Sequence, residues 1–244
     1  MNLFILSRFK GCMKMERFEE DLSFLLSRLL EDVNDTVAQK LKGLKENLVD
    51  LYRRNLVKIN HSVMELLCAK RMILKGYEVD VERPLEGVLI CDLYGVKGDG
   101  VLIIEVETGY TPPEHALDPS TYNRARIASK IARYSAHSNK FGLGVPPNHI
   151  LQIHPVFTKP PRYRRDEELE SVKALCDKYY VNPSISLDEI RNGRLHSVYI
   201  IDVDGASVQE IDPEAYIEFS STIPYISQGP PERTLRLESR ENSD

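Results

Sequence analysis

The sequence predicts an α/β protein with a central mixed sheet, preceded by a helical extension. Three observations support this fold class. Apolar residues recur every three or four positions over residues 18–51, which is typical of amphipathic helices. From residue 77 the period changes to two, in Val- and Ile-rich segments separated by Gly and Pro, which indicates strands. The resulting order is helix, three strands, helix, strand.

Residues 1–57 are the predicted helical arm. Its apolar stripe fits one long helix or two, and the run Asn34-Asp35-Thr36 is a candidate break with a new N-cap. Residues 1–14 fit no clear pattern. Such a stripe either packs on its own domain or forms a homodimer, and the pattern alone does not distinguish the two. The stripe consists of Phe18, Leu22, Leu25, Leu29, Val33, Val37, Leu41, Leu44, Leu48 and Leu51.

Residues 58–160 are the predicted core. Its first helix covers residues 60–75 and ends at Gly76, a typical helix stop. Strands are expected at residues 77–82, 88–94 and 101–108, and the turn Gly98-Asp99-Gly100 joins the last two as a hairpin. A helix at residues 122–138 follows. After residues 142–147, the apolar run at 150–157 is the expected fourth strand.

Residues 161–227 are predicted to form a C-terminal α/β extension. Within it, a helix is expected at residues 166–180 and a strand at 197–203. The remaining residues, 228–244, are polar and contain Gly-Pro-Pro, so we expect a disordered tail.

The charge balance excludes some classes of protein. The 244 residues include 32 Lys and Arg against 37 Asp and Glu, a net charge of −5. No global positive field therefore draws the chain to nucleic acid, and phosphate binding would need a local basic patch. The 4 cysteines have no CxxC spacing, which disfavours a structural zinc site. With no apolar run of about 20 residues, we expect no membrane partner and a cytoplasmic location.

Acidic residues gather in the predicted hairpin. In its second strand, alternation puts Glu105 and Glu107 on one face and Val106 on the other. The hairpin can set Asp92 close to Glu105. Carboxylates in such apolar strands carry a desolvation cost unless a positive charge offsets it. Mg²⁺ or Mn²⁺ would supply this charge, because these ions prefer carboxylate and carbonyl oxygens, such as the carbonyl of Val106. Ordinary charged residues at a strand end near solvent are the structural alternative.

Five short motifs follow one another along the predicted core. They are Met64-Glu65-Leu-Leu, Lys75-Gly76-Tyr77-Glu-Val, Cys91-Asp92-Leu, Ile104-Glu105-Val-Glu107 and Ala125-Arg126-Ile-Ala-Ser-Lys130. Their order resembles the PD-(D/E)XK nuclease superfamily, and most of all an archaeal group with the same Glu-x-Glu-Thr-Gly and Ala-Arg-Ile-Ala-Ser-Lys stretches. The resemblance covers residues 58–157. It implies a restriction-endonuclease-like αβββαβ core that hydrolyses phosphodiester bonds with Mg²⁺ or Mn²⁺, with DNA as the expected substrate.

The resemblance assigns roles to individual positions. It makes Asp92 and Glu105 metal ligands, and Glu65 the helix glutamate that many members add to the metal site. Glu107 stands where the motif has Lys, and a glutamate cannot supply that positive charge to the reaction. Lys130, on the neighbouring predicted helix, is the candidate replacement. Glu107 is then either a third metal ligand or a base.

Two basic groups are candidates for holding nucleic acid. Arg126 and Arg133 share one face of the predicted helix with Lys130. A second group follows the last predicted core strand, where Arg and Lys can neutralise phosphates and Tyr163 can stack on a base. The alternatives are a solvated helix surface and a solvated linker. The second group is Lys159, Arg162, Arg164 and Arg165.

Two main hypotheses follow from these residues. The first is a metal-dependent nuclease in which Asp92, Glu105, Glu107 and Lys130 form the catalytic set. The second is a catalytically inactive nucleic-acid-binding or assembly module, in which the core persists without the motif lysine and the N-terminal helices bind a partner. A structural oligomer whose acidic strand faces water is a third interpretation.

Overall fold

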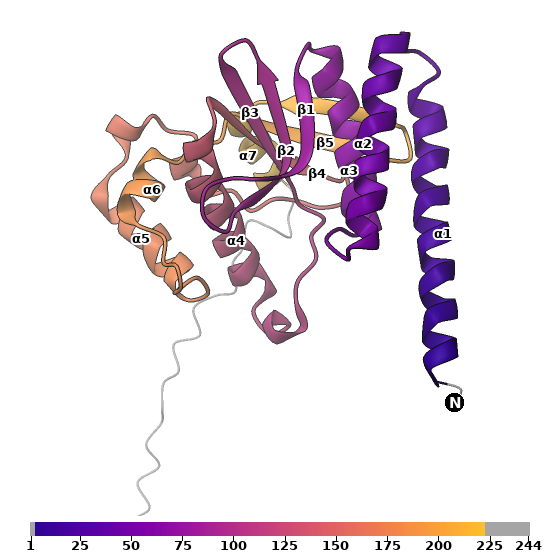
Figure 1. The fold of residues 1–244 in the computed structure, drawn as a ribbon. Coiled ribbons are helices and arrows are strands. Elements are labelled where there is room, and N and C mark those ends of the chain that lie inside the picture. The colour runs from indigo at the N-terminus through magenta and orange to yellow at the C-terminus, as the bar shows by residue number, and fades with distance from the viewer. Residues whose placement is uncertain (1–2, 223–244) are drawn as a thin grey trace, which may run out of the picture.

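The computed structural model describes residues 3–222, with side chains from residue 14 onward, and shows an α/β fold around one mixed, open sheet (Figure 1). The predicted tail, residues 228–244, lies outside the described residues. The strands are β1 (Glu78–Pro84), β2 (Ile90–Lys97), β3 (Gly100–Val106), β4 (Lys140–Val145), β5 (Ser197–Asp202) and β6 (Ser207–Ile211). The α-helices are α1 (Leu3–Leu29), α2 (Asp35–Arg53), α3 (Ile59–Leu74), α4 (Pro119–Tyr134), α5 (Asp166–Asp177), α6 (Leu187–Asn192) and α7 (Pro213–Ser221). Short 3₁₀ helices are η1 (Pro113–His115), η2 (Ser135–His137), η3 (Pro155–Phe157) and η4 (Pro161–Tyr163).

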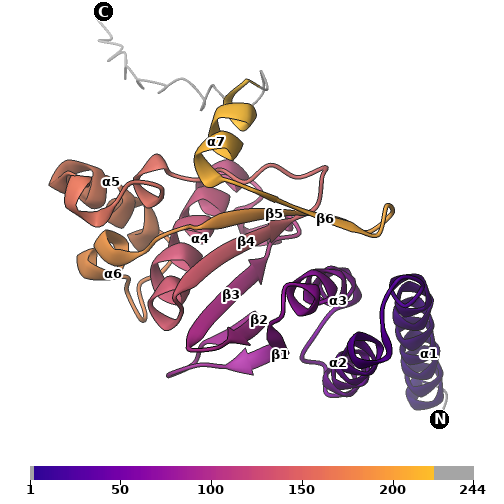
Figure 2. The same cartoon turned by 90° about the horizontal axis from the view of Figure 1, so that it is seen from above.

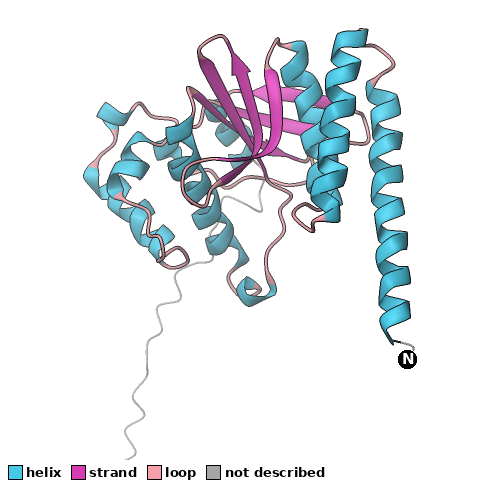
Figure 3. Cartoon of the chain, viewed as in Figure 1, coloured by secondary structure: helices cyan, strands magenta, loops and turns pink. Residues whose placement is uncertain are grey.

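Within residues 3–222 the sheet has 6 strands in the order β1-β2-β3-β4-β5-β6. β4 runs parallel to β3 and β5, whereas the remaining neighbours are antiparallel. The α-helices lie on both sides of the sheet: α1, α2 and α3 on one side, and α4, α5 and α6 on the other (Figures 2 and 3). Each side has its own apolar core, and successive residues of β3 alternate between them: Ile103 faces α4, and Ile104 faces α3. The predicted alternation in this strand is confirmed.

The N-terminal arm consists of two helices that pack within their own chain. The predicted break is confirmed: the side chain of Asn34 accepts a hydrogen bond from the backbone N–H of Val37 at 3.0 Å, capping α2. Phe18 is buried in the stripe, and its ring stacks on Tyr52 with centroids 3.8 Å apart. The apolar stripe therefore belongs to the core on the α3 side of the sheet. A homodimer through these helices remains a prediction.

The fourth strand is not where the sequence placed it. Residues 150–157 form a loop followed by η3, so the prediction of a strand there was wrong. Pro155 has no N–H to offer a sheet ladder. Leu151 and Phe157 are apolar because they fill the core on the α4 side.

The true fourth strand, β4, contains two glycines that give no strand pattern in the sequence. A Cβ atom at Gly142 would lie 2.6 Å from the ring of Tyr199, and one at Gly144 would lie 2.7 Å from Cδ1 of Ile201. Large side chains of β5 therefore occupy the space above β4, and only glycine fits beneath them.

The C-terminal segment completes the same sheet, because β5 and β6 pair beyond β4. The expected helix and strand of this segment correspond to α5 and β5, whereas α6, β6 and α7 were not predicted. None of the helices among the described residues is both long and apolar enough to cross a membrane.

Candidate metal centre

The centre begins where β2 and β3 separate. Their pairing runs from Lys97 and Gly100 to Leu93 and Ile104, and stops there. Beyond that point, side-chain carboxylates in place of backbone carbonyls accept hydrogen bonds from the backbone N–H groups of the two strands. The N–H of Asp92 donates to Oε1 of Glu105 at 3.0 Å, and the next donor, the N–H of Val106, binds Oδ2 of Asp92 at 2.5 Å. The predicted proximity of Asp92 and Glu105 is confirmed, and both residues are buried.

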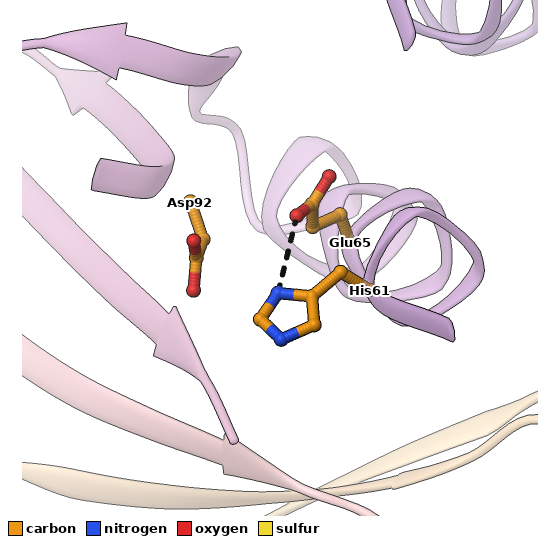
Figure 4. Close-up of side chains that lie close together, drawn as sticks. All are labelled: His61, Glu65 and Asp92. Carbon is orange, nitrogen blue, oxygen red and sulfur yellow. Dashed lines mark ion pairs between the residues drawn. The ribbon is translucent and has the colours of Figure 1, made fainter. Parts of the chain in front are cut away.

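Helix α3 brings two more side chains to the same place. Glu65 and His61 lie one turn apart, and both face the carboxylate of Asp92 (Figure 4). One ligand atom from each of these three residues lies within 4.8 Å of the others. Glu65 is 0% exposed, and neither of its oxygens has a hydrogen-bond partner among the described residues. Nδ1 of His61 lies 3.8 Å from its Oε1.

Negative charge is crowded in this part of the molecule. Burial, reinforced by repulsion from Asp92 and Glu82, raises the pKa of Glu65 well above its usual range. Burial and then Asp92 likewise raise the pKa of Glu105 to about 8. The same two causes raise the pKa of Glu82 to about 7. The cluster therefore holds more carboxyl groups than the surrounding residues can keep ionised.

Lys130 reaches into the centre from α4. Its Nζ lies 2.8 Å from Oε1 of Glu107 and 3.1 Å from Oε2 of Glu105. The same nitrogen is 3.9 Å from Oδ2 of Asp92 and donates to the carbonyl oxygen of Val106 at 3.4 Å. Burial opposes the charged amine, but these carboxylates outweigh it and raise the pKa of Lys130 well above its usual range. The ammonium therefore lies against Glu105 and Glu107. Its role as the replacement for the motif lysine stays a prediction.

Glu107 is held between two cations. Besides Lys130, it forms an ion pair with Arg126, whose Nε lies 3.3 Å from Oε1 of Glu107. Arg126 also donates to the carbonyl oxygen of Tyr110 at 2.7 Å. Although burial opposes ionisation, Lys130 and Arg126 lower the pKa of Glu107. An ionised Glu107 is therefore paired with both cations and positions them. The roles of third metal ligand or base stay predictions.

The glycine that follows Glu107 and Thr108 is required by the backbone conformation of the turn. Gly109 adopts a φ of +80°, a conformation that favours glycine. A Cβ atom there would lie 2.6 Å from Nδ1 of His149. The turn brings the carbonyl of Tyr110 back to Arg126, so this glycine supports the pairing of Glu107.

The predicted nucleic-acid contacts divide into two groups. Arg126 and Arg133 lie beside the centre on α4, and Arg133 stands 5.5 Å from the ring centroid of Tyr180. In the second group, Lys159 and Arg165 both pair with Glu168. Arg162 lies over the ring of Tyr163.

Arg164 corrects the sequence prediction. It is only 5% exposed, so its guanidinium cannot meet a phosphate. Instead it donates to backbone carbonyls between 2.6 and 3.0 Å away, and it fastens the loop before α5 to α6. These acceptors are the carbonyl oxygens of Lys159, Ile190 and Arg191.

Two members of the centre were missed by the sequence analysis. His61 precedes Glu65 by four residues, a spacing that places both on one helix face and could have been noticed. Glu82 lies in β1 opposite Asp92 of β2, because the residues before and after it pair with Leu93 and Cys91. Glu82 itself has a φ of 50° and does not take part in the pairing of β1 with β2. No local sequence pattern predicts that Glu82 lies next to Asp92.

The centre thus joins carboxyl groups from α3, β1, β2 and β3 with one imidazole and the ammonium of Lys130. Its members come from positions between residues 61 and 130, and the fold alone brings them together. Comparisons with protein families, with curated proteins and with solved structures found no match for this chain.

Proposed function

We propose that this protein is a metal-dependent nuclease that hydrolyses phosphodiester bonds in DNA. Elements α3, β1, β2, β3, α4 and β4 follow the order helix, three strands, helix, strand. This order supports the resemblance to the PD-(D/E)XK superfamily and a restriction-endonuclease-like core. The acidic cluster lies at the end of the β2–β3 pairing, where the motif residues Asp92 and Glu105 stand.

The observation that carries the proposal is the buried carboxyl group of Glu65, which meets no N–H donor among the described residues and faces a second carboxyl group, that of Glu82. Burying an ionised carboxylate without a partner lowers the stability of the fold by roughly several kcal/mol, unless a cation or a proton neutralises its charge. Glu65 and Asp92 offer carboxylate oxygens, and His61 offers an imidazole nitrogen, within 4.8 Å of one another. Glu105, the second motif carboxylate, lies beside them and holds the N–H of Asp92 and the ammonium of Lys130. This donor set fits Mg²⁺ or Mn²⁺, with the imidazole favouring Mn²⁺. A divalent ion held there would lower the pKa of a coordinated water and offset negative charge on a phosphate.

The chain itself would contribute the cation that the motif position lacks. Lys130 is held by Glu105 and Glu107, and its side chain is 19% exposed, so the ammonium sits at the edge of the centre. From there it can hold a phosphate oxygen and stabilise the charge that builds up during hydrolysis. Arg126 fixes Glu107, and Glu107 in turn fixes Lys130.

The experiment is a cleavage assay on supercoiled and single-stranded DNA with Mg²⁺, Mn²⁺ or EDTA. We expect cleavage that requires the metal and falls at least about a hundredfold in Asp92→Asn and Glu105→Gln. Asp99→Asn is the matched control, because Asp99 is an exposed carboxylate in the turn of the same hairpin. Cleavage that persists in both site variants would contradict the assignment.

A second candidate function is a non-catalytic nucleic-acid-binding module. The observation in its favour is that Lys130 and Arg126 are already engaged by carboxylates of the same chain. This alternative predicts no cleavage with either metal, together with salt-sensitive DNA binding. Parallel cleavage and binding assays distinguish the two functions.

A further inference from the structure

A groove of about 250 Å³ opens beside the metal centre, along α4. It shares Arg126 and Lys130 with the centre, so whatever occupies the groove meets two cations that contact the acidic cluster. Three tyrosines and three cations dominate its lining. They are Tyr122, Tyr134, Tyr180, Arg126, Lys130 and Arg133.

The aromatic rings of the groove are held in place by their neighbours. Tyr122 stacks on His115 with centroids 4.1 Å apart and meets Tyr179 edge-on at 5.5 Å. The hydroxyl of Tyr134 donates to the carbonyl oxygen of Ile90 at 3.0 Å. Rings fixed in this way lose little freedom when a ligand binds.

The cations differ in how firmly the chain engages them. Arg126 and Lys130 are tied to carboxylates of the centre. Arg133 stands over the ring of Tyr180 and donates from one nitrogen to the carbonyl oxygen of Pro183 at 2.5 Å. A guanidinium has five N–H donors, so Arg133 retains the capacity to bind a phosphate while it stays on the ring.

We propose that this groove holds an unpaired nucleotide of a single-stranded nucleic acid next to the metal centre. The inference rests on the proposed function and names its substrate class. A base can stack on a tyrosine only when its face is uncovered, which a duplex does not allow. Rings interleaved with cations are the arrangement that binds single strands, with Arg133, held over the ring of Tyr180, on the phosphate and the base against the tyrosines of the groove.

The overall charge supports the same choice. At a net charge of −5 the chain has no general attraction for a duplex backbone. Affinity must then come from a local site in which stacking adds to a few phosphate contacts. The groove provides both within reach of the centre.

The test is a binding measurement by fluorescence anisotropy in EDTA, so that no cleavage occurs. The probes are labelled oligothymidylate, labelled oligouridylate and a labelled DNA duplex of the same length. We expect one or both single strands to bind at least about tenfold more tightly than the duplex. Comparing oligothymidylate with oligouridylate shows whether the protein prefers a deoxyribose or a ribose strand. Duplex binding equal to or tighter than both single strands overturns the proposal, as does no binding of any probe.

Variants locate the binding. Tyr180→Leu should weaken single-strand binding by about 5-fold to 100-fold, whereas Tyr180→Phe keeps the ring and should bind like wild type. Phe24→Leu is the control, because Phe24 is an aromatic residue of α1 that is 69% exposed and does not line the groove. Unchanged binding by Tyr180→Leu overturns the proposal.

If circular dichroism shows that Tyr180→Leu does not fold, Arg133→Gln takes its place. Arg133→Gln should weaken single-strand binding and reduce the slope of log K against log salt concentration by about the contribution of one phosphate contact. Unchanged binding with an unchanged slope would overturn the proposal. Because these measurements need neither metal nor turnover, their failure is distinct from a failure of the nuclease assignment.

Discussion

Arg164 and Glu65 are both buried in this protein, and they differ in what surrounds them. Arg164 is 5% exposed, and its guanidinium is satisfied by three backbone carbonyl oxygens. Glu65 is 0% exposed, and its two oxygens have no hydrogen-bond partner among the described residues. The comparison separates two uses of a buried ionisable group. Arg164 is part of the architecture, whereas we propose that Glu65 serves a bound ion.

The energetic consequences differ in the same way. A buried charge with all its partners stabilises its surroundings, and removing it leaves those partners exposed to the cost of desolvation. A buried carboxyl without partners has an unfavourable free energy that only a proton or a cation relieves. Burial raises the pKa of Glu65, in accord with this difference.

The largest stability effect is expected at Arg164. Arg164→Met removes the donors of three backbone carbonyls and should lower the free energy of unfolding by about 3 kcal/mol. Urea denaturation measures this change. Arg162→Met, at a neighbouring arginine that lies over the ring of Tyr163, is the control and should change the free energy by less than about 0.5 kcal/mol. A free energy of unfolding equal to that of the wild type for Arg164→Met would show that the buried guanidinium does not stabilise the fold.

Metal addition should stabilise the protein by a somewhat smaller amount. At a Mn²⁺ concentration about 100 times its Kd, the free energy of unfolding should rise by about 2.7 kcal/mol, because the ion binds only the folded state. Thermal unfolding with and without Mn²⁺ measures this rise. Asp92→Asn should lose it, and Asp99→Asn, in the exposed turn, should keep it. An equal rise in all three proteins would place the ion elsewhere.

The smallest effect is expected for Glu65 itself. Glu65→Met, studied without metal, should raise the free energy of unfolding by about 1 kcal/mol, because it replaces an unsatisfied carboxyl with an apolar group of similar size. Chemical denaturation in EDTA measures the difference, and the exposed Glu86 provides the control variant Glu86→Met. Destabilisation as large as that of Arg164→Met would show that Glu65 has a structural role after all.

The predictable part of the centre was the part fixed by local geometry. The period of two and the glycine-rich turn determine the register of the hairpin, so Asp92 and Glu105 could be paired from the sequence. Lys130 could be proposed because an acidic cluster needs a cation and the next helix carries one. His61 was within reach through its spacing from Glu65, although a single histidine on a helix is more often an ordinary surface or core residue than a metal ligand.

The rest depended on contacts between distant residues. Nothing in the sequence around Gly142 shows that Tyr199 lies above it, so β4 was misplaced. Among the arginines at 162, 164 and 165, local sequence does not reveal that Arg164 alone turns inward to meet α6. Glu82 joins the cluster only because β1 pairs with β2, and that pairing is again a property of the whole fold.

The most direct test is a crystal structure with Mn²⁺, examined by anomalous scattering at the manganese edge. We expect one strong peak bounded by the carboxylates of Glu65 and Asp92 and by the imidazole of His61, at bond distances of about 2.1 to 2.3 Å, with Lys130 still beside Glu105. A structure without a peak at this position, in which protein groups donate to the oxygens of Glu65, would contradict the account.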